Sequence, residues 1–177
     1  PFIDPTEWEA YLKKLHDGLW RVINTESTTK FICYAHRGAS QYFPENTMTS
    51  FREGVAMGAN GIETDVQRTK DGVLVLFHDD TLMRVTGEEG SICDYTYEEL
   101  QNFWVKKGDL QDKIPTLEEF LGEFGEEELN FAIELKVDGV EKDVVDMVRK
   151  YGVETRTIIT SFGFDRLCKV KEYAPLV

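Results

Sequence analysis

The stretch Gly61-Ile62-Glu63-Thr64-Asp65-Val66 decides the fold class, because it reads as a short buried strand that carries two ionisable residues. Three further apolar runs have the same form: 31–35 followed by His36-Arg37-Gly38, 73–77 followed by His78-Asp79, and 131–136 with Glu134 and Lys136. Charges beside buried strands are costly unless a partner, a metal or a ligand compensates them. Since the carboxyl ends of strands face the active site in parallel α/β barrels, we expect the four stretches to converge on one site.

The composition is that of a soluble globular protein, and 177 residues predict a single domain over 1–177. The chain has 33 Asp and Glu against 20 Lys and Arg, a net charge of −13. Because no basic patch is present, we expect neither nucleic acid nor an anionic membrane surface as a partner. An anionic substrate would need a metal ion or dedicated cations to offset the negative field.

The cysteines Cys33, Cys93 and Cys168 are odd in number and far apart in the chain. This argues against a disulfide framework or a zinc knuckle and favours a reducing compartment. No apolar run approaches the ~18 residues that a membrane span needs. We therefore expect a cytoplasmic protein without stable membrane insertion, unless a targeting segment precedes Pro1.

Strands and helices alternate along the chain, which favours a parallel sheet with right-handed crossovers. A first helix is predicted from Asp4 to Leu19, and a fifth strand at 157–160. Helical spacing or helix signals recur in four later stretches, namely 46–57, 116–124, 140–151 and 165–173. The stretch 79–115 is too long for an ordinary connection between a strand and a helix, so we expect an inserted segment there. The capping box Thr96-Tyr97-Glu98-Glu99 predicts that part of this insertion is helical.

Glu63 and Asp65 are one residue apart on a strand, so both side chains point to the same face. Two carboxylates so placed repel each other unless a cation lies between them, and Mg²⁺ and Ca²⁺ prefer such oxygen ligands. Glu134 repeats this geometry on another strand. The alternative is that these carboxylates form buried ion pairs with Lys136 or Arg37, and spacing alone does not decide between the two.

His36 and His78 both follow short apolar strands. Histidine titrates near neutral pH, so two of them can act as general base and general acid. The alternative for each is a histidine that caps a strand end by bonding a nearby carbonyl, but two at equivalent strand ends, near three carboxylates, favour catalysis. Arg37 offers a guanidinium fork suited to phosphate, although a surface ion pair is the commoner role.

An ordered set of motifs between His36 and Pro175 resembles the signature of the glycerophosphodiester phosphodiesterases. It consists of His36-Arg37-Gly38, Pro44-Glu45-Asn46-Thr47, Phe51, Gly58-Ala59, Glu63-Thr64-Asp65-Val66, Thr69-Lys70-Asp71-Gly72, Val75, His78-Asp79, Leu82, Arg84, 114–119, Glu134-Leu135-Lys136, Ser161-Phe162, Leu167, Lys171 and Pro175. One departure is Val85, where the family usually has Thr.

The resemblance implies a TIM-type (β/α)8 barrel with an insertion after the third strand, which fits 79–115. It also implies metal-dependent hydrolysis of glycerophosphodiesters to glycerol phosphate and an alcohol, with one divalent ion, magnesium or calcium. The implied roles are an acid/base pair in His36 and His78, metal ligands in Glu63, Asp65 and Glu134, phosphate contacts from Arg37 and Lys136, and supporting positions at Glu45 and Asn46.

The chain carries about five strands, whereas such a barrel needs eight and typically ~250 residues. We expect the native protein to continue past Val177 by roughly 60–80 residues, or two copies to associate through open strand edges. Two other functions stay open at this point. One is a phospholipase of a related barrel group, against which the charge of −13 and the lack of a basic amphipathic helix argue. The other is a catalytically silent module that binds a phosphometabolite, which the missing strands favour and the intact motifs oppose.

Overall fold

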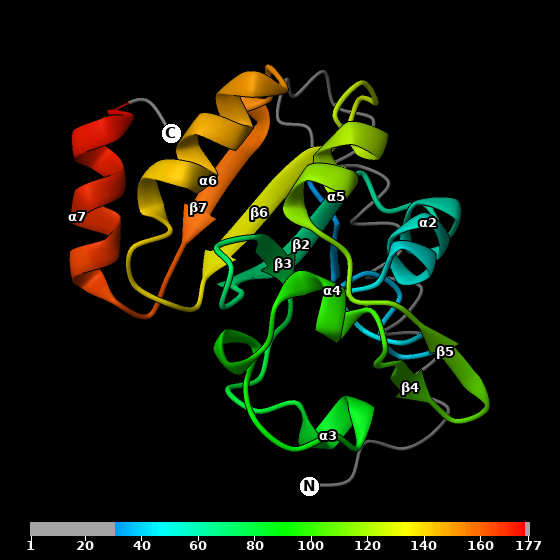
Figure 1. The fold of residues 1–177 in the computed structure, drawn as a ribbon. Helices are drawn as coiled ribbons and strands as arrows, with labels where there is room; N and C mark the ends of the chain where they lie inside the picture. The colour runs from blue at the N-terminus through cyan, green and yellow to red at the C-terminus, as the bar shows by residue number, and fades with distance from the viewer. Residues whose placement is uncertain (1–30, 176–177) are drawn as a thin grey trace, which may run out of the picture. The chain divides into compact units, whose positions relative to one another are not determined.

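The computed structural model describes residues 31–175 (Figure 1). The helix predicted from Asp4 to Leu19 lies outside the described residues. Within them, the element order begins with β1 (Tyr34–His36), α2 (Met48–Ala56), β2 (Gly61–Arg68) and β3 (Leu74–Leu76). It closes with α5 (Leu117–Phe124), β6 (Asn130–Leu135), α6 (Glu141–Lys150), η2 (Glu154–Arg156), β7 (Thr157–Thr160) and α7 (Phe164–Tyr173).

Strand β2 lies at the centre of a parallel sheet with the order β1-β2-β6-β7. The register places His36 opposite Glu63 and Glu134 opposite Asp65. Because side chains alternate between faces of a strand, Glu63, Asp65 and Glu134 all project from one face of this sheet. The backbone pairing alone therefore brings together ionisable residues that are about 70 positions apart, as the register of Glu134 with Asp65 shows.

The alternating pattern had predicted that the third strand, β3, is parallel to its neighbours. In the structure β3 is antiparallel to β2. The chain reverses at 69–72, where the Thr69 amide donates to the Val73 carbonyl at 3.0 Å and Gly72 adopts φ 91°. A glycine fits this left-handed backbone without steric cost. Among residues 31–175 the sheet therefore has five strands, of which β1, β2, β6 and β7 are mutually parallel. The prediction of these five strands is confirmed, and the prediction that the strand at 73–77 is parallel to the others is wrong.

Helices α2, α5, α6 and α7 lie next to the sheet (Figure 1). Their buried residues form the main core together with alternate residues of β2 and β6. Ile62 and Ile133 are fully buried there, beside tilted and edge-on contacts among Phe51, Phe120 and Phe131. The predicted capping box at Thr116 is confirmed, because its hydroxyl accepts from the Glu119 amide at 3.0 Å and the Glu119 carboxylate accepts from the Thr116 amide at 2.8 Å. This cap starts α5 at the core-facing Leu117.

The predicted insertion contains α3 (Met83–Thr86), η1 (Ile92–Asp94), α4 (Tyr97–Leu100) and the hairpin β4 (Val105–Lys107) and β5 (Leu110–Asp112). Its capping box at Thr96 is formed as predicted. The segment has a small core of its own around Leu82, Ile92, Leu100 and Ile114, which Val75 and Phe77 of the β3 stretch join. The insertion therefore packs on the strand that leads to His78. No helix among residues 31–175 is long and apolar enough to cross a membrane.

Candidate functional site

Three carboxylates from β2 and β6 form the centre of the candidate site. Oxygen atoms of Glu63, Asp65 and Glu134 all lie within 4.8 Å of one another. The Asp65 side chain is buried, and those of Glu63 and Glu134 are less than one-fifth exposed. The structure thus brings together the three residues predicted as metal ligands.

Asp65 is held from several sides by groups that the sequence had singled out. Its Oδ2 accepts from Asn46 Nδ2 at 2.9 Å and lies 3.4 Å from Arg37 Nε. Asn46 adopts φ 54°, and its own Oδ1 accepts from the Thr64 hydroxyl at 2.8 Å. Asp65 Oδ1, by contrast, is buried and has no hydrogen-bond partner among the described residues. A buried carboxylate oxygen left in this way is a position at which a cation fits.

The electrostatics of the group point in the same direction. Burial, together with the negative charges of Asp65 and Glu134, raises the pKa of Glu63 to about 7. Lys136 Nζ lies 3.0 Å from Glu134 Oε1 and 3.7 Å from Asp65 Oδ1, so the predicted ion pairs are also present. They do not neutralise the group, because Arg37 is shared with a fourth carboxylate, Glu45, at 3.0 Å. The residues therefore fit a divalent cation, whose charge would complete the compensation.

His36 is the last residue of β1, and Arg37 begins the tight turn that follows this strand. Arg37 has φ 56°, and its amide donates both to the Glu63 carbonyl at 3.0 Å and to Glu63 Oε2 at 3.1 Å. Gly38 follows with φ 78°, and a Cβ on it would meet the Ser50 backbone of α2 at 2.5 Å. The close approach of this turn to α2 therefore requires glycine. His36 Nε2 lies 3.8 Å from Glu63 Oε2, and its side chain is 66% exposed.

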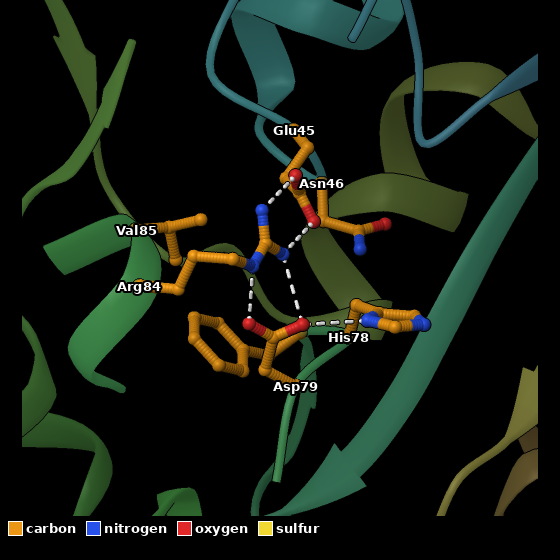
Figure 2. A pocket seen from close by; sticks show the side chains of 7 residues that line it. Glu45, Asn46, His78, Asp79, Arg84 and Val85 are labelled. Carbon is orange, nitrogen blue, oxygen red and sulfur yellow. Dashed lines mark hydrogen bonds and ion pairs between the residues drawn. The ribbon is translucent and has the colours of Figure 1, made fainter. Parts of the chain in front are cut away.

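His78 arrives from β3, the returning arm of the hairpin, which folds back beside Asp65. The Phe77 amide donates to the Asp65 carbonyl at 2.9 Å, and this hydrogen bond places the backbone of the next residue, His78, beside the part of β2 that carries Asp65. The ring Nδ1 of His78 pairs with Asp79 Oδ1 at 2.6 Å, and Figure 2 shows Asp79 between that ring and the guanidinium of Arg84. His78 thus reaches the site region by a reversal of the chain and not from a parallel strand end.

Asp79 and Arg84 are two residues to which the sequence analysis assigned no role. The guanidinium of Arg84 donates to Asp79 at 2.8 Å, and to the two carboxylate oxygens of Glu45 at 2.7 and 2.9 Å. The adjacency of Asp79 to His78 was a signal in the sequence, but the pairing of Arg84 with Glu45, 39 positions away, was not visible. The roles predicted for His36, His78, Arg37, Lys136, Glu45 and Asn46 stay predictions at this stage, since geometry alone does not test them.

The comparisons with known proteins agree with the resemblance seen in the sequence. Residues 36–177 match the glycerophosphoryl diester phosphodiesterase family. A glycerophosphodiester phosphodiesterase of Caldanaerobacter subterraneus subsp. tengcongensis is 39% identical over 155 residues, which cover 82% of this chain and 64% of that protein. The chain thus spans a little less than two thirds of the length of this relative.

Solved structures give the same family. The crystal structure of a glycerophosphodiester phosphodiesterase from Agrobacterium tumefaciens matches with a TM-score of 0.77 and 28% identity, over 82% of this chain and 64% of that one. A phosphodiesterase of Oleispira antarctica, solved in complex with the product sn-glycerol-3-phosphate, matches with a TM-score of 0.65 and 27% identity, over 82% and 63%. The predicted fold class, a TIM-type barrel represented here by part of its sheet, is confirmed. The chain belongs to the glycerophosphoryl diester phosphodiesterase family.

Proposed function

We propose that the protein hydrolyses glycerophosphodiesters to glycerol phosphate and an alcohol. The observation that carries the proposal is the grouping of Glu63, Asp65 and Glu134 within 4.8 Å, with Arg37 and Lys136 in contact with it. A divalent ion held by these carboxylates, together with Arg37 and Lys136, would supply the positive charge that the oxygens of a phosphodiester need. The sn-glycerol-3-phosphate bound as product in the Oleispira antarctica phosphodiesterase supports the same substrate class.

Glu63, Asp65 and Glu134 would hold one divalent ion, magnesium or calcium. Asp65 Oδ1, which accepts no hydrogen bond from the described residues, and the raised pKa of Glu63 support this assignment. When bound, such an ion supplies positive charge that offsets the charge developing on the phosphoryl oxygens. Both ions accept carboxylate oxygens, so the ligand set is compatible with either of them.

The chain's own residues divide the remaining work between phosphate binding and proton transfer. Arg37 and Lys136 orient the phosphodiester by contacts with its non-bridging oxygens. One of His36 and His78 takes the proton of the nucleophile, either water or the neighbouring hydroxyl of the substrate. The nucleophile forms a new bond to phosphorus, the bond to the alcohol oxygen breaks, and the other histidine protonates the departing alkoxide. With water as nucleophile this step gives glycerol phosphate directly. With the substrate hydroxyl it gives a cyclic glycerol phosphate, whose ring water then opens at phosphorus to give the same product. Glu45 accepts a hydrogen bond from Arg37 at 3.0 Å, and Asn46 donates one to Asp65 at 2.9 Å, so these two residues orient the groups that would contact phosphate and metal.

An assay with glycerophosphocholine tests the proposal directly. We expect release of glycerol phosphate that rises with added Mg²⁺ or Ca²⁺ and that excess chelator abolishes. Asp65→Asn should remove this activity, whereas Glu128→Gln, at an exposed position outside the site, should not change it. Activity that persists in excess chelator would defeat the metal assignment, and absence of turnover with either ion would defeat the proposed reaction. The cytoplasmic location stays a prediction.

A further inference from the structure

Arg84 of the insertion forms the centre of a five-residue network beside the site, with Asp79, Glu45, His78 and Arg37. Its Nη2 donates to Asp79 Oδ1 at 2.8 Å and to Glu45 Oε1 at 2.7 Å, and its Nη1 donates to Glu45 Oε2 at 2.9 Å. Its Nε also binds Asp79. Both carboxylates are therefore held by the same planar guanidinium, with two hydrogen bonds each (Figure 2). This paired geometry is one that lysine cannot reproduce.

Each of the two carboxylates has a second partner that belongs to the proposed site. Asp79 Oδ1 pairs with His78 Nδ1 at 2.6 Å, and Glu45 Oε1 accepts from Arg37 Nη1 at 3.0 Å. Arg84 thus connects the acid/base group His78 with the phosphate-binding group Arg37. A carboxylate at Nδ1 fixes the ring orientation of a histidine and leaves Nε2 for the substrate.

The network is filled by its own side chains and is not a second ligand site. Glu45, His78 and Asp79 offer ligand atoms close enough for a metal, but the guanidinium of Arg84 contacts both of these carboxylates. The space enclosed by these residues with Phe77 and Val85 has no room for a water molecule. Arg84 and His78 also lower the pKa of Asp79 to about 2, which keeps this carboxylate charged.

The backbone that carries Arg84 is fixed by the core of the insertion. On either side of Met83 and Arg84, Leu82 is fully buried and Val85 is 8% exposed, and the short helix α3 ends at Gly87 with φ 82°. The side chain itself is 52% exposed. A single exposed ion pair contributes little, but a bidentate network of several charges is the exception to that rule.

We propose that Arg84 is a positioning residue that holds His78 through Asp79 and Arg37 through Glu45, so that the insertion orients both halves of the site. This inference rests on the proposed function, since it assigns His78 a role in proton transfer. Its consequence is that the loss of Arg84 should lower kcat while the metal ligands stay in place, because β2 and β6 hold those independently of the insertion.

The test compares Arg84→Ala with a matched control, Arg52→Ala. Arg52 is also about half exposed and also forms a bidentate pair, with Glu123 at 2.6 Å, but that pair lies between α2 and α5. We expect Arg84→Ala to lower kcat by roughly 10–100-fold, as for other groups that orient a catalytic residue, with a smaller change in KM. Added guanidinium should restore part of kcat in Arg84→Ala. Arg52→Ala should keep its kcat and show no response to guanidinium.

Two further measurements keep the test decisive. The double variant Arg84→Ala/Asp79→Asn should lose no more kcat than the larger of the two single losses, because Arg84 acts on His78 through Asp79. Arg84→Lys, which keeps the charge but not the fork, should melt like the wild type and still lose kcat. Independent effects of Arg84 and Asp79, or full kcat in Arg84→Lys, would overturn the proposal.

An NMR measurement separates this inference from the proposed function. The proton between His78 Nδ1 and Asp79 should give a low-field signal in the wild type that Asp79→Asn and Arg84→Ala both lose and Arg52→Ala keeps. This readout needs no turnover, so a wild type without phosphodiesterase activity but with the signal would refute the reaction and not the positioning. A signal that Arg84→Ala leaves unchanged would refute the positioning, whatever the activity.

Discussion

The carboxylates of the sheet and the histidine of the hairpin are positioned in two different ways. Glu63, Asp65 and Glu134 owe their proximity to the register of β2 with β6, a set of backbone hydrogen bonds that no single side chain controls. His78, by contrast, pairs with the side chain of Asp79, which Arg84 binds in turn. Backbone pairing brings charges together whether or not they attract each other, whereas side-chain pairing depends on each partner. The sheet can therefore hold a repulsive cluster for a cation, and the insertion can hold a histidine in one orientation.

The largest effect should come from removal of either histidine. We expect His36→Ala and His78→Ala each to lower kcat by ~10²–10⁴, the usual contribution of a general acid or base. The double variant should lose less than the product of the two if both act in one proton-transfer step. Steady-state kinetics with glycerophosphocholine measure all three. A single variant with near-normal turnover would exclude that histidine from the mechanism.

A second prediction concerns the cluster held by the sheet. Asp65→Asn should weaken binding of Mg²⁺ or Ca²⁺ by roughly 10–100-fold or more, since oxygen sites with few ligands have little affinity to lose. His78→Ala should leave that affinity nearly intact, because His78 is held by the hairpin and the insertion. Isothermal titration of both variants with each ion measures the difference. Equal losses of affinity in the two variants would show that sheet and insertion do not act separately.

Much of the carboxylate cluster on the sheet could be predicted from the sequence, because it depends on the spacing of residues that are close together in the chain. Residues two positions apart on a strand share a face, so Glu63 and Asp65 were predicted side by side, and the capping boxes at Thr96 and Thr116 were predicted from four-residue spacings. The direction of β3 was not predictable in this way. A short apolar run reads the same in a parallel and an antiparallel strand, and the alternating pattern favoured the wrong one.

The network around Arg84 could not be predicted from the sequence, because its contacts join residues that are far apart in the chain. Arg84 meets Glu45 across 39 positions, and neither residue lies on a regular strand whose register would align them. A charged residue in a long insertion is most often a solvated one, so the sequence analysis assigned no role to Arg84, although this residue is one of the family's motif positions. The packing of Leu82 and Val85 in the insertion's core positions the backbone that carries this side chain, and no spacing in the sequence reveals that packing.

A third prediction compares the two turns that deliver the histidines. Gly38→Ala places a Cβ 2.5 Å from the Ser50 backbone and imposes φ 78° on alanine, so we expect a loss of stability of ~1–3 kcal/mol or more. Gly72→Ala imposes a similar φ of 91°, but no described atom lies within 4 Å of the added Cβ. Its loss should therefore be smaller, about 1 kcal/mol. Urea unfolding of both variants measures the difference. Equal losses would show that backbone strain alone, and not the contact with α2, sets the cost of replacing Gly38.

The smallest expected effect is a pH dependence of the stability that Asp79 contributes. Arg84 is the first cause, with His78, that lowers the pKa of Asp79 from its ordinary 3.8 to about 2 in the folded protein. A carboxylate whose pKa is lower in the folded than in the unfolded state stabilises the fold above the unfolded pKa. That stabilisation should be present above about pH 4 and be lost as the pH falls toward about 2. Because Arg84 is half exposed, we expect less than ~1 kcal/mol. The difference in urea midpoint between the wild type and Asp79→Asn should therefore shrink between pH 4 and pH 3, and a difference that grows on acidification would contradict the ion pair.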